Sequence, residues 1–173
     1  MQRVAIIGPA ASGKSTLARR LQEATGIEAF HLDELYWGPG YTPMPQSDWQ
    51  ELLDELVSRA AWIIDGNFTA SLPERTAVAD TVIFLDLPRA VCLVAAVKRR
   101  LLFGVRRAPG MAQGCRPMFN WTLLRWIWSF PDDHRPYYLR LLSEPIPGRT
   151  VVVLRRRRDV RRFLAGVTTR ART

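Results

Sequence analysis

The stretch Gly8-Pro-Ala-Ala-Ser-Gly-Lys-Ser15 matches the pattern G-x-x-x-x-G-K-[ST], whose glycines let successive backbone N–H groups point inward around a phosphate. The apolar run Val4–Ile7 precedes it and has the composition of a strand buried on both faces. After it, residues 14–25 place apolar side chains at helical spacing, and Gly26 predicts the end of that helix. A strand, a glycine loop and a helix in this order predict a phosphate-binding loop in an α/β domain.

The residues of this loop have separate expected roles toward ATP and Mg²⁺. Lys14 is expected to reach the β- and γ-phosphates as a mobile positive charge, which makes it a catalytic as well as a binding residue. The hydroxyl of Ser15 is expected to coordinate Mg²⁺. The motif predicts that the nucleotide is bound by Gly8, Ala11, Ser12, Gly13, Lys14, Ser15 and Thr16.

Length and composition indicate one domain spanning residues 1–173, large enough to bury an extensive core. The two cysteines, Cys92 and Cys115, are far apart and the chain has only two histidines, so neither a disulfide framework nor a zinc site is expected. The first strand begins almost at the N-terminus, which leaves no room for a signal peptide, and no run of 18 apolar residues occurs. We therefore expect a soluble, cytoplasmic protein without a membrane partner.

The net charge of +9 at pH 7, carried mostly by arginine, favours polyanionic partners. One interpretation is that the arginines surround a polyphosphate pocket, and another is that one face binds nucleic acid. A third is that they only keep solvated faces charged. Composition does not separate these three.

An acidic residue follows the second predicted strand, residues 27–32. In an open parallel sheet, ligands bind at the carboxyl ends of the strands, so Asp33 is expected to orient or deprotonate the hydroxyl of an acceptor substrate. The alternative is an aspartate that caps a helix or closes a turn. His31 is interpreted as a structural residue, packed or hydrogen-bonded rather than catalytic.

A third apolar run, residues 61–64, ends in Asp65-Gly66. An apolar strand that ends in aspartate, after a phosphate-binding loop, is typical of the second nucleotide motif, whose carboxylate holds Mg²⁺ or one of its waters. Ser15 and Asp65 are therefore the predicted metal ligands.

Residues 34–46 form a loop punctuated by proline and glycine that also contains Tyr36, Trp37 and Tyr41. This aromatic content is too high for a plain linker. The rings are expected either to fold back onto the domain or to form a wall of the acceptor pocket.

A basic segment rich in glycine and proline, residues 98–118, is expected to be a lid inserted in the domain. A lid needs hinges and positive charges that close on phosphates, and this segment contains both. The candidates for contact with the phosphates are Lys98, Arg99, Arg100, Arg106 and Arg107. Of these, Arg100 and Arg107 are expected to act on the transferring phosphoryl group. The alternative is a solvated basic loop.

The last predicted strand, residues 150–154, is followed by the four arginines Arg155–Arg158 near the start of a helix. Cations are unfavourable at the start of a helix, because the positive end of the helix dipole lies there. We therefore expect an anion or a planar ring to bind these arginines and reduce the repulsion. A nucleotide base stacked on guanidinium is one solution and DNA phosphate is another. Arg155 and Arg157 are the predicted nucleotide-binding residues of this segment.

The chain resembles the small proteins known as DNA topology modulation proteins, relatives of adenylate and shikimate kinases, over nearly its whole length. The stretches that carry the resemblance are Gly8–Thr16, His31–Leu35, Trp37, Pro39-Gly40, Trp62–Phe68, Ala79–Asp86, Pro88-Arg89, Cys92-Leu93, Met111-Ala112, Gly114-Cys115, Arg125–Trp128, Val153–Arg155 and Arg157. The resemblance implies a three-layer P-loop fold with a five-stranded parallel sheet in the order 2-3-1-4-5, helices on both faces, an ATP site and a phosphoryl-acceptor site.

These features lead to two main hypotheses. The first is an ATP- and Mg²⁺-dependent phosphotransferase that acts on a nucleotide-like or small hydroxylated acceptor. The second is an ATP-regulated DNA-binding protein that affects DNA topology, with affinity that falls steeply with salt. A third possibility is an ATP-binding protein with little catalysis.

Overall fold

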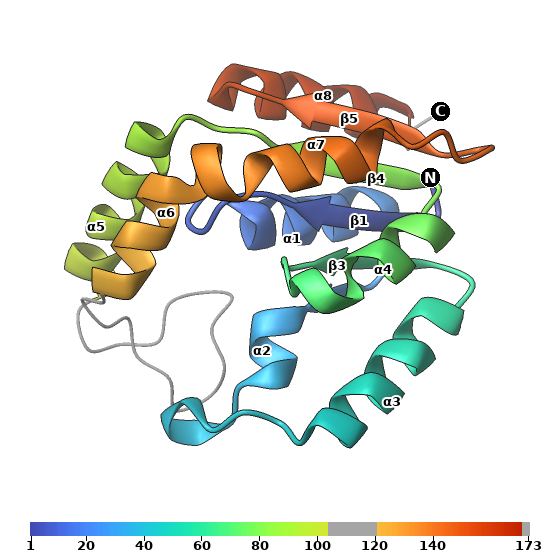
Figure 1. Cartoon of the computed structure of the whole chain (residues 1–173). Helices are drawn as coiled ribbons and strands as arrows, with labels where there is room; N and C mark the ends of the chain where they lie inside the picture. Colours follow the sequence, from blue (N-terminus) through green and yellow to red (C-terminus); the bar gives the residue numbers. More distant parts are fainter. Residues whose placement is uncertain (104–120, 171–173) are drawn as a thin grey trace.

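A five-stranded parallel sheet forms the centre of the computed structural model, which describes residues 1–103 and 121–170 (Figure 1). The strand order is β2-β3-β1-β4-β5, and every neighbouring pair is parallel. The strands are β1 (Arg3–Ile7), β2 (Ala29–His31), β3 (Trp62–Asp65), β4 (Thr81–Leu85) and β5 (Thr150–Leu154). The predicted fold class and strand order are confirmed.

Helices cover both faces of the sheet (Figure 1). One face packs against α1 (Lys14–Thr25) and α8 (Arg157–Arg170). The other face packs against α3 (Gln46–Ser58), α4 (Leu72–Val78), α6 (Trp121–Asp133) and α7 (Arg135–Ser143). Beside the phosphate-binding loop, α5 (Arg89–Phe103) packs against α6 through a smaller apolar cluster.

The central strands are buried on both faces, as is usual for parallel sheets. In β1, Ala5 and Ile7 join the cluster under α3 and α7, whereas Val4 and Ile6 join the cluster under α1 and α8. This burial explains why the central strands read as continuous apolar runs. It also places their carboxyl ends, and the loops that follow them, at one edge of the sheet.

The second strand differs from the sequence-based expectation. The strand expected over residues 27–32 is only Ala29–His31, because Leu32 already begins the short helix α2 (Leu32–Tyr36). Pro131 lies inside α6, which continues past it to Asp133. Two 3-10 turns, Pro39–Tyr41 and Thr69–Ser71, complete the described elements.

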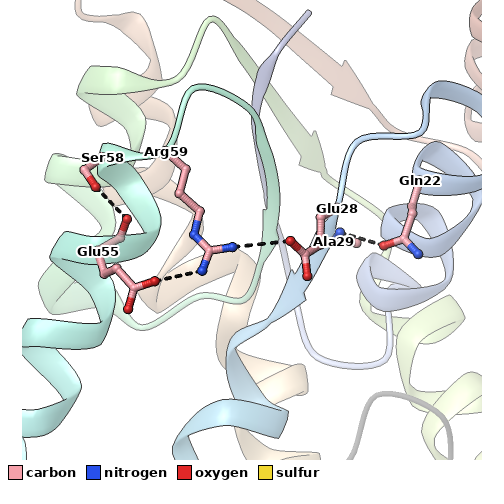
Figure 2. A network of polar contacts seen from close by, with 6 residues as sticks. All are labelled: Gln22, Glu28, Ala29, Glu55, Ser58 and Arg59. Carbon is pink, nitrogen blue, oxygen red and sulfur yellow. Dashed lines mark hydrogen bonds and ion pairs between the residues drawn. The ribbon is translucent and has the colours of Figure 1, made fainter.

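The edge strand β2 is tied to its neighbours by the polar contacts in Figure 2. Arg59, just after α3, donates to Glu55 at 2.7 Å and to Glu28 at 3.3 Å. The next backbone N–H, of Ala29, donates to Gln22 Oε1 on α1 at 2.7 Å. These contacts fix the start of the strand that carries His31 and leads into α2.

Within residues 1–103 and 121–170, no helix is long and apolar enough to cross a membrane.

Candidate active site

The phosphate-binding loop joins β1 to α1, and its backbone requires glycine at the first position. Gly8 has φ 142°, and a Cβ atom there would lie 2.6 Å from the carbonyl oxygen of Leu85 on β4. Ala11 and Gly13 also have positive φ, at 58° and 98°. The Gly8 N–H donates to Asn67 Oδ1 at 3.2 Å. This hydrogen bond connects the first residue of the phosphate-binding loop to the loop that follows β3.

Lys14, the first residue of α1, folds back over this loop. Its Nζ donates to the carbonyl oxygens of Gly8 and Pro9, each at 3.0 Å. Burial lowers the pKa of Lys14, whereas the negative charges of Asp33 and Asp65 oppose that shift. The ammonium group therefore lies beside the phosphate-binding loop, where the negative charges of Asp33 and Asp65 act on it.

The two predicted metal ligands lie together. Ser15 Oγ donates to Asp65 Oδ1 at 3.3 Å, across a sequence separation of 50 residues. Asp65 Oδ2 contacts His31 Nδ1 at 2.5 Å, and this bond raises the pKa of His31. The interpretation of His31 as a hydrogen-bonded residue is confirmed, but the sequence did not indicate that its partner would be Asp65.

Asp33 lies in the first turn of α2, two residues after the end of β2 in sequence. It is not the helix cap, because His31 occupies that position. Although Asp33 is exposed, surrounding protein atoms remove part of the hydration of its carboxylate and raise its pKa. The positive charges of Lys14 and Arg99 act in the opposite direction and lower the pKa of Asp33.

Arg99 on α5 was one of the basic candidates for the phosphates, but not one of the two arginines chosen from them. It is half-buried, burial lowers its pKa, and its positive charge lowers the pKa of both Lys14 and Asp33. Arg100 was expected in this role; its Nε is shielded from solvent and has no hydrogen-bond partner in the described part of the chain. Arg107 and most of the expected lid, residues 104–118, lie outside the described residues.

The arginines after β5 lie near another acidic strand end. Asp86 follows β4 and accepts two hydrogen bonds from Arg135, at 2.7 and 2.8 Å. Arg155 Nε is 3.6 Å from the same carboxylate, and the Arg155 side chain is 69% exposed. Arg157 is exposed at the first position of α8, and its charge lowers the pKa of Cys92 against the larger effect of burial. Both predicted nucleotide-binding arginines are therefore accessible.

The other residues of the motif differ in exposure. Ser12 is buried, and its hydroxyl has no hydrogen-bond partner within residues 1–103 and 121–170. Thr16 is exposed on α1.

The aromatic loop folds back onto the domain through Tyr36. The Tyr36 ring makes edge contacts with Trp37, Trp49 and Phe68 at centroid distances of 4.8 to 5.0 Å. Trp37 contacts Tyr41 at 6.1 Å, and both residues are partly exposed. Tyr36 packs onto the core beside α3. Of the two expectations for this loop, folding back onto the domain therefore holds for the Tyr36 ring.

Arg75 on α4 organises the loop after β3, a role that the sequence did not indicate. It is fully buried, and its guanidinium donates to the carbonyl oxygens of Gly66, Asn67 and Phe68. Burial lowers the pKa of Arg75 to about 10. A usable sequence signal was the pair Gly66-Asn67 at the carboxyl end of a strand, where turns need satisfied backbone groups.

The comparisons with known proteins find similar structures but no similar sequence family. No protein-family model matches the sequence, and a search of curated proteins finds no significant relative. Shikimate kinase from Acinetobacter baumannii, solved with shikimate, superposes with a TM-score of 0.59 at 19% identity, over 96% of this chain and 90% of that one.

Two further solved structures are similar to this chain over its whole length. Shikimate kinase from Bacteroides thetaiotaomicron has a TM-score of 0.57 at 15% identity, over 99% of both chains. Deoxyadenosine kinase from M. mycoides, solved with dATP, has a TM-score of 0.56 at 12% identity, over 100% of both chains. The chain therefore has the α/β fold of the P-loop kinases.

Proposed function

We propose that this protein is an ATP- and Mg²⁺-dependent phosphotransferase. The observation that carries the proposal is the convergence of Lys14, Ser15, Asp65 and Asp33 at the carboxyl ends of three neighbouring strands. A phosphate-binding cation, a pair of oxygen ligands and a free carboxylate are the groups that phosphoryl transfer to a hydroxyl requires.

In the proposed reaction, the oxygen of an acceptor hydroxyl forms a bond to the γ-phosphorus of ATP. The bond from that phosphorus to the β,γ-bridging oxygen breaks, and ADP leaves. Asp33 accepts the proton of the hydroxyl, a role that its raised pKa favours. Lys14 and Arg99 reduce the negative charge around the transferring group, a role that the effect of both positive charges on Asp33 supports.

The residues present fit a magnesium ion. Ser15 and Asp65 offer a hydroxyl and a carboxylate oxygen, which are hard ligands of the kind that Mg²⁺ prefers, and they lie 3.3 Å apart. When bound with ATP, the ion would neutralise charge on the phosphates. The chain's own part is to hold these two oxygens beside the phosphate cradle.

The acceptor is proposed to be a nucleotide or another small molecule with a hydroxyl group. The similar structures are named for shikimate and deoxyadenosine, which both carry hydroxyl groups. Transfer of labelled γ-phosphate from ATP should be measured with nucleoside monophosphates, nucleosides, hydroxy acids and sugars. Labelled product with one class supports the proposal and identifies that class. Binding of ATP without transfer to any class contradicts it.

Lys14→Ala should lower the rate of transfer by at least about 100-fold, because it removes a charge that acts on the transferring phosphoryl group. Arg20→Gln is the matched control, since Arg20 is an exposed cation on the same helix. Substantial turnover in Lys14→Ala, with a wild-type melting temperature, would refute the assignment of Lys14.

A second candidate function is regulated binding of nucleic acid, and one observation favours it. Arginines at and just before the N-terminal part of α8 are exposed, namely Arg155, Arg156, Arg157, Arg158, Arg161 and Arg162. Electrostatic binding of duplex DNA predicts that the affinity falls with salt, with a log-log slope of about 0.9 per phosphate contacted. Absence of binding at low salt eliminates this candidate.

A further inference from the structure

His31 and Asp65 are partners in the register of β2 and β3. Register partners in a sheet point to the same face, so the imidazole lies alongside the carboxylate. His31 Nδ1 is 2.5 Å from Asp65 Oδ2, although 34 residues separate the two in sequence. Because a carboxylate only accepts hydrogen bonds, Nδ1 is the donor.

The chain that follows both strands holds this pair together. Gly66 has φ 137°, and a Cβ atom there would lie 2.8 Å from the Cβ atom of Leu32. The absence of a side chain at Gly66 thus allows the two strand ends to approach closely. Both polar side chains are shielded, with 12% of His31 and 4% of Asp65 exposed. The hydrogen bond is therefore formed away from bulk water, where geometry is well maintained.

This arrangement gives the two oxygens of Asp65 different partners. Oδ2 is held by His31, whereas Oδ1 faces the hydroxyl of Ser15. A carboxylate held at one oxygen cannot rotate freely, so the other oxygen keeps its direction. Mg²⁺ needs nearly ideal octahedral geometry, and it therefore gains from an oxygen that is already oriented.

We propose that His31 is a positioning residue for the metal site: it fixes the Asp65 carboxylate so that Oδ1 is presented beside Ser15 to the cation or to one of its waters. This inference rests on the proposed function, in which Ser15 and Asp65 hold the ion. The interaction that carries this role is the bond from Nδ1 to Asp65, and the oxygens assigned to the ion are those of Ser15 and Asp65.

Two substitutions separate hydrogen bonding from packing. His31→Asn retains an N–H donor at the position of Nδ1, since both nitrogens are bonded to Cγ. His31→Phe retains the ring shape and removes the donor. Binding of Mn²⁺ to the complex with ATP is measured by electron paramagnetic resonance, and the Mg²⁺ concentration for half-maximal transfer is measured in parallel.

His31→Phe should weaken Mn²⁺ binding and raise the Mg²⁺ requirement by about 10- to 100-fold, the usual effect of losing an outer partner of a metal ligand. His31→Asn should recover most of the wild-type affinity. ATP affinity without metal should stay within about twofold in both variants, and Arg20→Gln should behave like wild type. If His31→Phe does not fold, His31→Leu serves as the variant without a donor.

The possible failures can be told apart. If His31→Phe binds Mn²⁺ like wild type while Asp65→Asn binds it weakly, the role of His31 is refuted and the proposed function stands. If His31→Asn is as weak as His31→Phe, the hydrogen bond is not the cause and the inference is overturned. If the wild-type complex with ATP binds no Mn²⁺, the role of His31 and the proposed function are both refuted.

Discussion

Two charged side chains at the site, Lys14 and Asp33, have pKa values shifted toward their neutral forms, and burial is the main cause for both. Each is partly relieved by the other, because the charge of Lys14 lowers the pKa of Asp33 and the charge of Asp33 raises that of Lys14. Groups that lose hydration in this way interact more strongly with a ligand of opposite charge or with a hydroxyl proton.

Asp33→Asn should lower kcat by about 100- to 10,000-fold, because it removes the proton acceptor and leaves the phosphate cradle intact. In the wild type, the rate should fall as pH falls through the pKa of Asp33, which burial raises from its ordinary value. Steady-state kinetics across the acid and neutral pH range measure both effects. Retained kcat in Asp33→Asn, with an unchanged pH profile, would show that Asp33 is not the base.

The same raised pKa affects stability in a defined direction. A carboxyl group with a raised folded-state pKa contributes stability that is present below its unfolded pKa and is lost as pH rises through the folded value. Wild type should therefore lose stability relative to Asp33→Asn across that window. The comparison uses melting temperatures of the two proteins at acid and neutral pH.

At the scale of elements, Arg75 connects α4 to the loop that follows β3. Its Nη1 donates to Gly66 at 3.0 Å and its Nε donates to Ser71 Oγ at 3.2 Å. The same loop contains Asn67, whose side chain accepts from the Gly8 N–H of the phosphate-binding loop. A buried arginine therefore supports the backbone on which the expected metal and phosphate sites depend.

Arg75→Leu should reduce the free energy of unfolding by about 2–4 kcal/mol, because buried carbonyl groups lose their donors. It should also weaken ATP binding, since Asn67 would no longer be held at Gly8. Urea denaturation and nucleotide titration measure the two effects. Arg140→Gln is the control, because Arg140 is exposed on α7 and its substitution should change stability by no more than about 0.5 kcal/mol. Equal stabilities for the two variants would contradict the role of Arg75.

The elements that sequence predicted well are those with a local pattern. The bounds of α1 and β5 match the expectation because apolar spacing and a terminal glycine or polar residue mark their ends. The predicted second strand, residues 27–32, is longer than the observed one, Ala29–His31. An apolar residue such as Leu32 fits the end of a strand and the start of a helix equally well. In the structure Leu32 begins α2, and its side chain lies against Gly66 at the end of β3.

At the scale of the whole molecule, the charge of +9 opposes folding through self-repulsion, and anions reduce that repulsion. Specific binding must therefore be separated from general screening. ATP at the proposed site would stabilise the folded state by an amount that grows with the ratio of its concentration to its Kd.

MgATP at 100 times its Kd should raise the melting temperature by about 5–10 °C, from about 2.7 kcal/mol of linkage. Sodium chloride at the same ionic strength should give a smaller increase, and Lys14→Ala should lose most of the difference between MgATP and salt. Differential scanning fluorimetry measures all three. The same increase with salt as with MgATP would indicate screening rather than a nucleotide site.

The sequence by itself determined the phosphate-binding loop, the α/β class and the residue types that end each strand, because glycine dihedrals, apolar spacing and helix stops act over a few residues. Tertiary structure alone decided which of these residues meet. Ser15 reaches Asp65 across 50 residues and Gly8 reaches Asn67 across 59. Strand register and helix placement bring His31 to Asp65, Arg75 to the Gly66 carbonyl and the charge of Arg99 into reach of Asp33. No local sequence pattern specifies these pairings.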